Sequence, residues 1–168
     1  MRKLSLLVGL VFMLALTARA QTPKAEIFGG YSYLRVNPNA GPGANLNGWE
    51  LSVNVKPASW WGIMGDFDGH YGSPFGPSAH EHSFLFGPQI NLPTPVISPF
   101  VHALFGVTKT NIAGATDTAF GSAFGGGFDF KAGSHFAWRL IQVDDLLTHF
   151  SGNNQNNLRV STGIVFRF

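Results

Sequence analysis

Apolar and polar residues alternate along most of this chain. In residues 49–56, WELSVNVK, every odd position is apolar and every even position is polar. The same period of two runs through residues 84–92, 120–130 and 158–168. Successive side chains of a β-strand point to opposite faces, so the pattern predicts strands with one apolar and one polar face. None of these segments has the i, i+3, i+4, i+7 spacing of an amphipathic helix.

The pattern predicts eight strands, over residues 25–36, 47–57, 60–71, 82–92, 97–109, 119–131, 135–150 and 156–168. Several are about 10 to 13 residues long, which suffices to cross a bilayer at a tilt. Short turns follow the second, fourth and sixth strands, whereas longer loops are expected at 37–46, 72–81 and 110–118, with a polar break at 151–155. This arrangement is typical of an outer-membrane β-barrel, with both termini on the turn side. The seventh strand keeps its alternation only with a β-bulge near Ile141.

The first 20 residues have the three parts of a secretory signal peptide. Arg2 and Lys3 are basic, residues 4–17 are apolar, and Ala18-Arg19-Ala20 fits an A-x-A cleavage site. We therefore expect cleavage near Ala20 and a mature chain, residues 21–168, that forms one barrel domain. Three of the 11 basic residues and none of the 9 acidic ones lie in the signal, so the remainder carries a net charge of −1. The basic balance of the full chain is thus no indication of nucleic-acid binding.

Composition narrows the class of protein further. The chain has no cysteine, which excludes disulfides and cysteine metal sites, and only 12% of its residues are charged, about half the usual share of a soluble domain. Beyond the signal there is no run of about 20 apolar residues for a membrane helix. The predicted fold is therefore all-β: an eight-stranded antiparallel up-and-down transmembrane β-barrel. A soluble lipocalin-like barrel would crowd too many large rings into a narrow interior: Trp49, Phe84, Phe124, Phe128 and Phe166.

Two short motifs resemble small OmpA-like outer-membrane β-barrel domains. Residues 28–33, FGGYSY, resemble their first strand, and residues 163–168, GIVFRF, look like their C-terminal assembly signal. The resemblance covers residues 25–168, and because the barrel is expected to extend to residue 168, the chain is closer to the short OmpX-like members. It implies delivery by periplasmic chaperones to the barrel assembly machinery of the bacterial outer membrane. The signal read there is formed in this sequence by Gly163, Phe166 and Phe168.

The first and last strands are expected to close the barrel. An open strand edge in hydrocarbon would leave backbone groups without hydrogen-bond partners, so residues 156–168 should pair with the first strand near residues 27–33. Gly29, Gly30 and Gly163 are expected to let this seam curve tightly.

The polar faces of the predicted strands carry charges of both signs. The expected interior network comprises Glu50, Asp66, Asp68, His102, Asp129, Arg139, Arg159 and Arg167, with Glu26, Lys56, His70 and Lys131 on the same inward faces. An eight-stranded barrel is too narrow for a general pore, and buried charges must be paired. We therefore expect these side chains to fill the interior as a hydrogen-bonded plug, with no cofactor and no metal ion. A narrow ion channel is the alternative.

Two local clusters have residue types that can carry chemistry. Asp66, Asp68 and His70 share one strand face and could bind a cation or transfer protons. His80 and His82 also share a face and could reach one metal ion, but a third ligand is not evident. We expect the first cluster to pair with interior arginines and the second to be an ordinary surface segment where a loop meets a strand.

The segment His149-Phe150-Ser151 is the strongest indication of an enzyme. It resembles outer-membrane lipid A deacylases, which are eight-stranded barrels whose nucleophilic serine follows a histidine by two residues, with an acidic residue beyond. Such catalysis needs a base next to the serine and a carboxylate that orients the base. Here no Asp or Glu follows Asp145. We therefore expect no catalytic residues and keep an outer-leaflet lipid A-modifying enzyme, acting through His149 and Ser151, as an alternative.

Together these features predict a non-enzymatic protein of the bacterial outer membrane with a structural or interaction role. Its expected surroundings are outer-membrane lipids and the assembly factors of the envelope, not nucleic acid. The predicted loops carry no motif that identifies an extracellular ligand.

Overall fold

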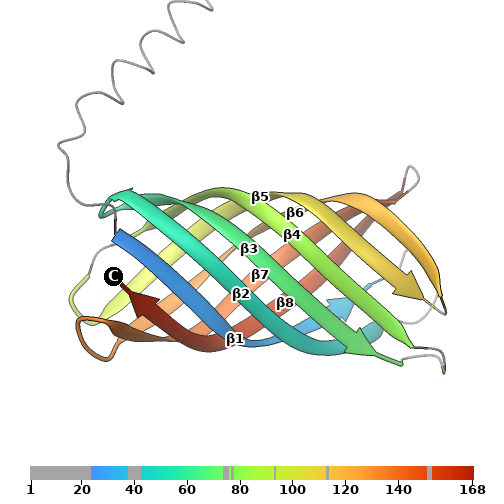
Figure 1. Ribbon diagram of the computed structural model, residues 1–168, viewed down its shortest axis with the longest axis horizontal. Helices are drawn as coiled ribbons and strands as arrows, with labels where there is room; N and C mark the ends of the chain where they lie inside the picture. Colours follow the sequence, from blue (N-terminus) through green and yellow to red (C-terminus); the bar gives the residue numbers. More distant parts are fainter. Residues whose placement is uncertain are drawn as a thin grey trace, which may run out of the picture.

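The computed structural model describes residues 24–37, 43–73, 76, 78–92, 94–112, 114–150 and 153–168. In this part of the chain, eight antiparallel strands close into one barrel (Figure 1). They are β1 (Lys24–Val36), β2 (Ala44–Ala58), β3 (Trp61–Gly72), β4 (Ala79–Asn91), β5 (Ile97–Ile112), β6 (Ala115–Lys131), β7 (Phe136–Phe150) and β8 (Asn153–Arg167). Each strand pairs with its neighbours in sequence, and β8 pairs with β1, which confirms the predicted barrel. The predicted signal peptide lies outside the described residues, which contain no helix long and apolar enough to span a membrane.

The barrel has two distinct ends. The connections from β2 to β3, β4 to β5 and β6 to β7 lie at the end that also holds Lys24 and Phe168, which we call the turn end (Figure 1). The other four connections lie at the opposite end, which we call the loop end. An even number of strands necessarily brings both chain ends to the same side of the barrel.

Two connections at the loop end are shorter than the sequence predicts. Only residues 113–114 separate β5 from β6, and only residues 151–152 separate β7 from β8. The long loop expected at 110–118 is therefore wrong, and the polar break expected at 151–155 is shorter than predicted. The side chain of Asn111 donates a hydrogen bond to Thr116 Oγ1 (2.8 Å) and accepts one from the Gly114 N–H (3.3 Å). Gly114 has a φ of 88°, which glycine adopts readily. Polar residues thus extend this hairpin without the alternation that marks the other strands.

The seam between β1 and β8 follows the predicted pairing. Ile27 lies opposite Phe166, and further along Gly30 lies opposite Gly163. A Cβ atom on either glycine would overlap backbone atoms of the other strand. Glycine at these two positions therefore lets the strands approach closely at the point where the barrel closes.

The seventh strand contains the predicted β-bulge. The ladder between β6 and β7 skips Leu140, which lies between Arg139 and Ile141, and the ladder between β7 and β8 is irregular at the same place. Both Leu140 and Ile141 are exposed on the outer face. Beyond the bulge, Gln142 and Asp144 are buried in the interior. The extra residue thus keeps Gln142 and Asp144 inside and Val143 outside, on the far side of the bulge.

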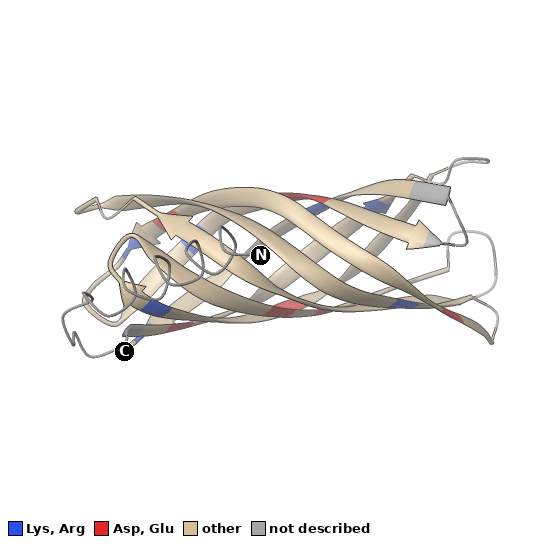
Figure 2. Ribbon diagram, turned by 90° about the horizontal axis from the view of Figure 1, so that it is seen from above, with Lys and Arg blue, Asp and Glu red and all other residues tan. Residues whose placement is uncertain are grey.

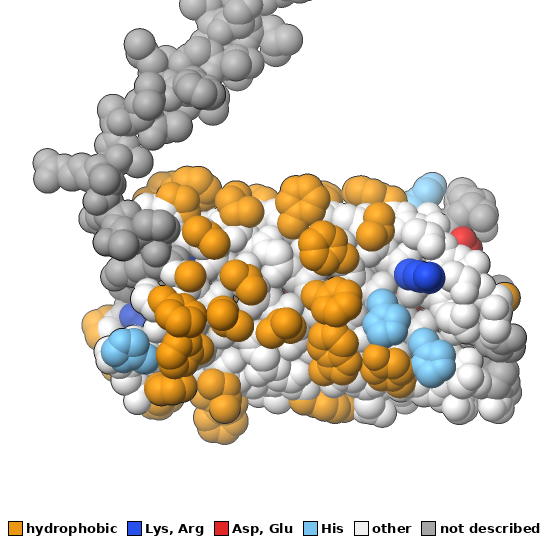
Figure 3. Space-filling view, in the orientation of Figure 1, with side chains coloured by type: hydrophobic (Ala, Val, Ile, Leu, Met, Phe, Trp, Pro, Cys, Tyr) orange, Lys and Arg blue, Asp and Glu red, His pale blue; other side chains and the backbone are white. Residues whose placement is uncertain are grey.

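The outer face of the barrel is apolar over most of its length (Figure 3). Large apolar side chains that are 37–62% exposed occur on all eight strands, for example Ile27, Trp49, Phe67, Phe86, Val101, Phe128, Trp138 and Ile164. We call this surface the apolar belt. Toward the loop end it gives way to polar side chains, as on β4, where the outward residues after Phe84 are His82 and His80. An apolar surface of this extent is not compatible with exposure to water.

The interior of the barrel is mixed, with apolar clusters beside the predicted polar network. One buried apolar cluster contains Leu34, Leu46, Met64, Ala79, Leu85, Leu104, Ala123 and Leu146, and a smaller one contains Phe28, Ala137 and Val165. The interior of an eight-stranded barrel is filled by side chains, and apolar groups pack there as well as paired polar groups.

Candidate functional site in the barrel interior

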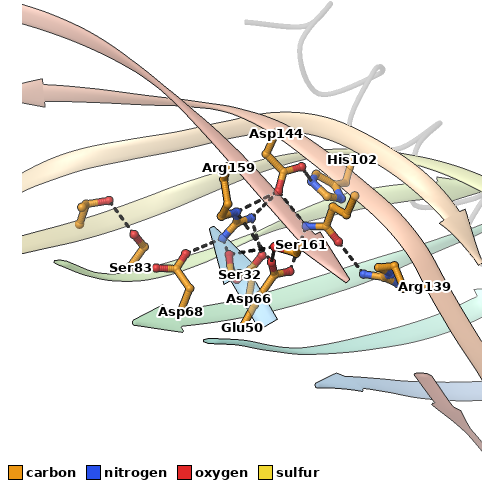
Figure 4. Close-up of polar contacts among 12 residues, drawn as sticks. Ser32, Glu50, Asp66, Asp68, Ser83, His102, Arg139, Asp144, Arg159 and Ser161 are labelled. Carbon is orange, nitrogen blue, oxygen red and sulfur yellow. Dashed lines mark hydrogen bonds and ion pairs between the residues drawn. The ribbon is translucent and has the colours of Figure 1, made fainter. Parts of the chain in front are cut away.

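Arg159 of β8 is the centre of an ion-pair network inside the barrel (Figure 4). Its side chain is completely buried, and Nη2 lies 2.8 Å from Asp66 Oδ2 and 2.7 Å from Asp144 Oδ2. Nη1 contacts the carboxylate of Asp68, and Nε lies 3.8 Å from Glu50 Oε2. The four carboxylates come from β2, β3 and β7. One guanidinium therefore joins four strands across the interior.

Neutral side chains provide further hydrogen bonds to these carboxylates. Gln142 Nε2 donates to Glu50 Oε1 (2.9 Å) and to Asp144 Oδ2 (2.7 Å). Ser161 Oγ donates to Glu50 Oε2 (2.6 Å) and lies 2.9 Å from Ser32 Oγ. Hydrogen bonds to an ionised carboxylate offset part of the cost of removing it from water.

Two buried histidines contact the same carboxylates. His102 Nε2 lies 2.8 Å from Asp144 Oδ1, and His70 Nδ1 lies 3.3 Å from Asp68 Oδ1. Four carboxyl groups therefore face the single guanidinium of Arg159 in this region. Each imidazole thus contacts a carboxylate that Arg159 also contacts.

Arg139 of β7 forms a second group next to this network. Its Nε donates to Asp129 Oδ1 (2.9 Å), and its Nη1 donates to Gln142 Oε1 (2.6 Å). The guanidinium carbon lies 4.3 Å from the centroid of the Phe28 ring and 4.2 Å from that of Phe100. The cation is thus held between two aromatic rings, whose faces attract positive charge. We call this group the Arg139 clasp.

The polar contacts continue from the Arg139 clasp to the turn end. Arg167 Nη2 lies 3.6 Å from Asp129 Oδ2, and Arg167 Nε lies 2.9 Å from Glu26 Oε1. The other oxygen of Glu26 lies 2.6 Å from Lys56 Nζ. The Arg167 side chain is 14% exposed, in contrast to the completely buried Arg159.

The structure places all eight residues of the predicted network on inward faces and divides them into two groups. Five of them, together with Asp144, belong to the Arg159 group: Glu50, Asp66, Asp68, His102 and Arg159. The other three lie toward the turn end: Asp129, Arg139 and Arg167. Gln142 bonds to both groups and so connects them.

Several residues of the network are not in the predicted set. Asp144 and Gln142 lie beyond the bulge of β7. Strict alternation continued from Trp138 would place both of these polar residues on the outer face. Glu81 is buried on the inward face of β4, where Thr110 Oγ1 donates to it at 3.4 Å. Extending the alternation of residues 82–92 backward by one residue would have placed Glu81 inside. Ser32 and Ser161 share the inward faces of their strands, but small hydroxyl groups give no distinctive signal.

His80 and His82 share the outward face of β4, as their spacing predicts. The Tyr71 ring makes edge contacts with both, at centroid distances of 5.4 Å and 5.5 Å. Glu81 points to the opposite face and cannot join them as a ligand. Among the described residues, no group of three or more His, Asp or Glu side chains is arranged to hold a metal ion.

His149 is exposed on the outer face of β7, and its predicted partner Ser151 lies outside the described residues. Asp144 is engaged by Arg159 in the interior and cannot orient His149. Asp145 shares the outward face of β7 but lies four positions away, about 13 Å along a strand. The described residues therefore supply no carboxylate from β7 at the position that a catalytic triad requires.

Comparisons with known proteins bear on the fold. No protein-family model and no curated protein matches this sequence. The attachment invasion locus protein Ail of Yersinia pestis is similar over 88% of this chain and 100% of its own, with a TM-score of 0.61 and 18% identity. Neisserial surface protein A matches over 86% of this chain and 97% of its own, with a TM-score of 0.69 and 10% identity. The N-terminal β-barrel domain of Pseudomonas aeruginosa OprF has the same coverage, with a TM-score of 0.55 and 12% identity.

At these identities, structural similarity is informative about architecture. It agrees with the closed barrel of eight strands. The predicted resemblance to small OmpA-like barrels is confirmed at the level of the fold, and the chain has the fold of the small outer-membrane β-barrels.

Proposed function

We propose that this chain is an integral, non-enzymatic β-barrel protein of the bacterial outer membrane, with a structural or interaction role and a closed interior. One observation carries this proposal: the polarity of the molecule is inverted, with a belt of apolar side chains outside and ion pairs inside. A barrel in lipid needs this arrangement, because hydrocarbon surrounds it and its polar groups must be satisfied internally.

The dimensions of the barrel support residence in a bilayer. The strands of the described chain contain 12 to 17 residues, more than a strand needs to cross a bilayer at a tilt. Exposed aromatic side chains lie near the turn end, including Trp60, Phe136 and Phe168. Trp and Phe at this level fit a membrane–water interface. The turn end then faces the periplasm, and the loop end faces the outside.

The Arg159 group favours a closed interior and argues against a narrow channel. Its bonds join β2, β3, β7 and β8 through a side chain with no exposed surface. Ion passage would require these contacts to separate, and unpaired buried charges are costly. In planar bilayers, we expect purified protein to give no steady conductance, with an open porin as the positive control. Stable single-channel steps under the same conditions would favour the narrow channel.

Cysteine labelling tests the position in the membrane. Cysteines at Val53, Phe86 and Phe124 in the apolar belt should be shielded by lipid, whereas a cysteine at Ala115 or Gly76 should react with an impermeant maleimide on intact cells. Labelling at Gly76 only after permeabilisation would reverse the orientation. Recovery of the mature protein in soluble periplasmic extracts would refute the barrel in the membrane.

An interaction role would lie at the loop end. Ail, at 18% identity, has been solved in complex with the heparin analogue sucrose octasulfate, which is a property of that protein. The similarity to Ail does not identify a ligand for this chain. The loop end of this chain carries imidazole, amide and hydroxyl groups, for example those of His80, Asn45 and Thr116.

Lipid A modification remains the second candidate, because His149 lines an outward hollow. This hollow, about 370 Å³ in volume, is also lined by Phe120, Ser122, Leu147 and Thr148. We expect purified protein to leave lipid A acyl chains intact, since Asp144 is engaged inside the barrel. Release of fatty acid that disappears in a Ser151→Ala variant would instead assign the enzyme.

A further inference from the structure

The turn end of the barrel opens into a cavity of about 460 Å³. It is surrounded by the first residues of β1, the last residues of β2, β6 and β8, and the turn at residues 133–135. A cavity of this size accommodates a small molecule. We call it the turn-end cavity.

Basic side chains outnumber acidic ones around this cavity. Lys56, Lys131 and Arg167 line it, whereas Glu26 is the only acidic side chain among its described lining residues. Figure 2 shows several Lys and Arg residues near the end of the barrel that holds the C-terminus.

Lys131 is the least compensated of the three cations. Its ammonium group donates a hydrogen bond to the backbone carbonyl of Thr94. Within the described part of the chain, no carboxylate lies within 4.0 Å of it, whereas Lys56 and Arg167 share the carboxylate of Glu26. An ammonium group has three donors, so Lys131 keeps hydrogen-bonding capacity for an anion in the cavity.

The three cations are spread around the opening. In the closed order of strands, β8 lies two strands from β2 and two strands from β6, and these strands carry Arg167, Lys56 and Lys131 respectively. Lys56 and Arg167 both contact Glu26, so a ligand with two or three anionic groups could contact these two cations at once. Arginine and lysine both bind carboxylates and phosphates, arginine with a planar pair of donors.

The interior beyond the cavity has the opposite charge balance. The Arg139 clasp lies between the turn end and the Arg159 group, where four carboxylates face one guanidinium. An anion attracted into the turn-end cavity would be repelled by these carboxylates and excluded by the packed rings of Phe28 and Phe100. The cavity is thus suited to hold an anion and not to pass it on.

We propose that the turn-end cavity binds a small multivalent oxyanion, carrying carboxylate or phosphate groups, through Lys131, Lys56 and Arg167. Placing this ligand in the periplasm rests on the proposed function, whereas the binding site itself does not. Binding can be measured on the folded barrel in detergent micelles, independently of its membrane orientation or conductance.

Isothermal titration calorimetry at low ionic strength tests the proposal, with citrate as a tricarboxylate probe and pyrophosphate as a phosphate probe. We expect saturable binding of at least one probe. Saturation by citrate alone assigns carboxylate ligands, and saturation by pyrophosphate alone assigns phosphate ligands. A Lys131→Gln variant should weaken binding about two- to fivefold, the effect of one charge pair in contact with water. A Lys131→Glu variant should abolish it.

Lys109→Gln is the matched control, because it removes the same charge from the outer face near the loop end. Its affinity should equal that of the wild type, and the gel shift between heated and unheated samples should show that every variant is folded. Absence of saturable binding to the wild type, or equal weakening by Lys109→Gln and Lys131→Gln, would overturn the proposal.

Discussion

Arg159 and Arg167 lie on the same strand and the same inward face, yet they occupy different electrostatic environments. Arg159 is completely buried and contacts four carboxylates. Arg167 is 14% exposed, contacts Glu26 and Asp129, and lines an open cavity. Identical side chains therefore have different roles: the first holds strands together where no water can replace it, and the second can exchange its protein partners for water or a ligand.

The largest expected effect is that of Arg159→Met. Methionine leaves the surrounding carboxylates buried without their guanidinium, which should lower the free energy of unfolding by about 3–5 kcal/mol. Urea titration of the barrel in detergent, followed by the heat-dependent gel shift, measures the change. A loss below about 1 kcal/mol, the range of a surface pair, would contradict the central role of Arg159.

Deletion of Phe168 distinguishes a role of this residue in assembly from a role in the stability of the folded barrel. The ring packs against Phe166 at a centroid distance of 4.7 Å, and lipid-facing burial of such a side chain stabilises by about 1.5–3 kcal/mol. If Gly163, Phe166 and Phe168 form the assembly signal, most of the deletion variant should fail to insert in cells while still refolding into detergent. Leu158→Ala is the control, because it removes apolar surface from the same strand away from the signal. Normal insertion without Phe168 would refute the signal.

Asp129→Asn probes the Arg139 clasp between the two regions. The variant removes a charged acceptor, but Arg139 keeps its bond to Gln142 and its contacts with two aromatic rings. We expect a loss of about 1–2 kcal/mol in the same urea titration. Asp117→Asn, at an exposed position near the loop end, should change stability by less than about 0.5 kcal/mol. Equal effects of the two variants would mean that the clasp contributes nothing specific.

The smallest expected effect is that of Arg167→Met, which matches the substitution at Arg159. Removal of the Arg167 side chain would open Glu26 to water in the turn-end cavity, and Lys56 still pairs with it, so the loss should stay below about 1 kcal/mol. A loss as large as that of Arg159→Met would mean that the two arginines contribute equally to stability and that water does not reach the turn end.

The sequence by itself determined the strands and the side of the sheet on which most residues lie. Alternation is a local property of the backbone, because each residue of a strand points opposite to its neighbour. The same logic predicted a bulge near Ile141, since the apolar parity of β7 changes there, and the ladder skips the neighbouring Leu140. It also predicted the β1–β8 seam, because a barrel in lipid cannot leave two edges open.

Only the tertiary structure decided which inward residues meet. Arg159 contacts carboxylates from β2, β3 and β7, and the register of every intervening strand sets these distances. Asp144 joins the network because one extra residue in β7 turns it inward. The apolar interior clusters, the short connections at 113–114 and 151–152, and the turn-end cavity likewise follow from how the strands are staggered. Stagger is a property of the closed sheet, and a period of two along one strand carries no information about it.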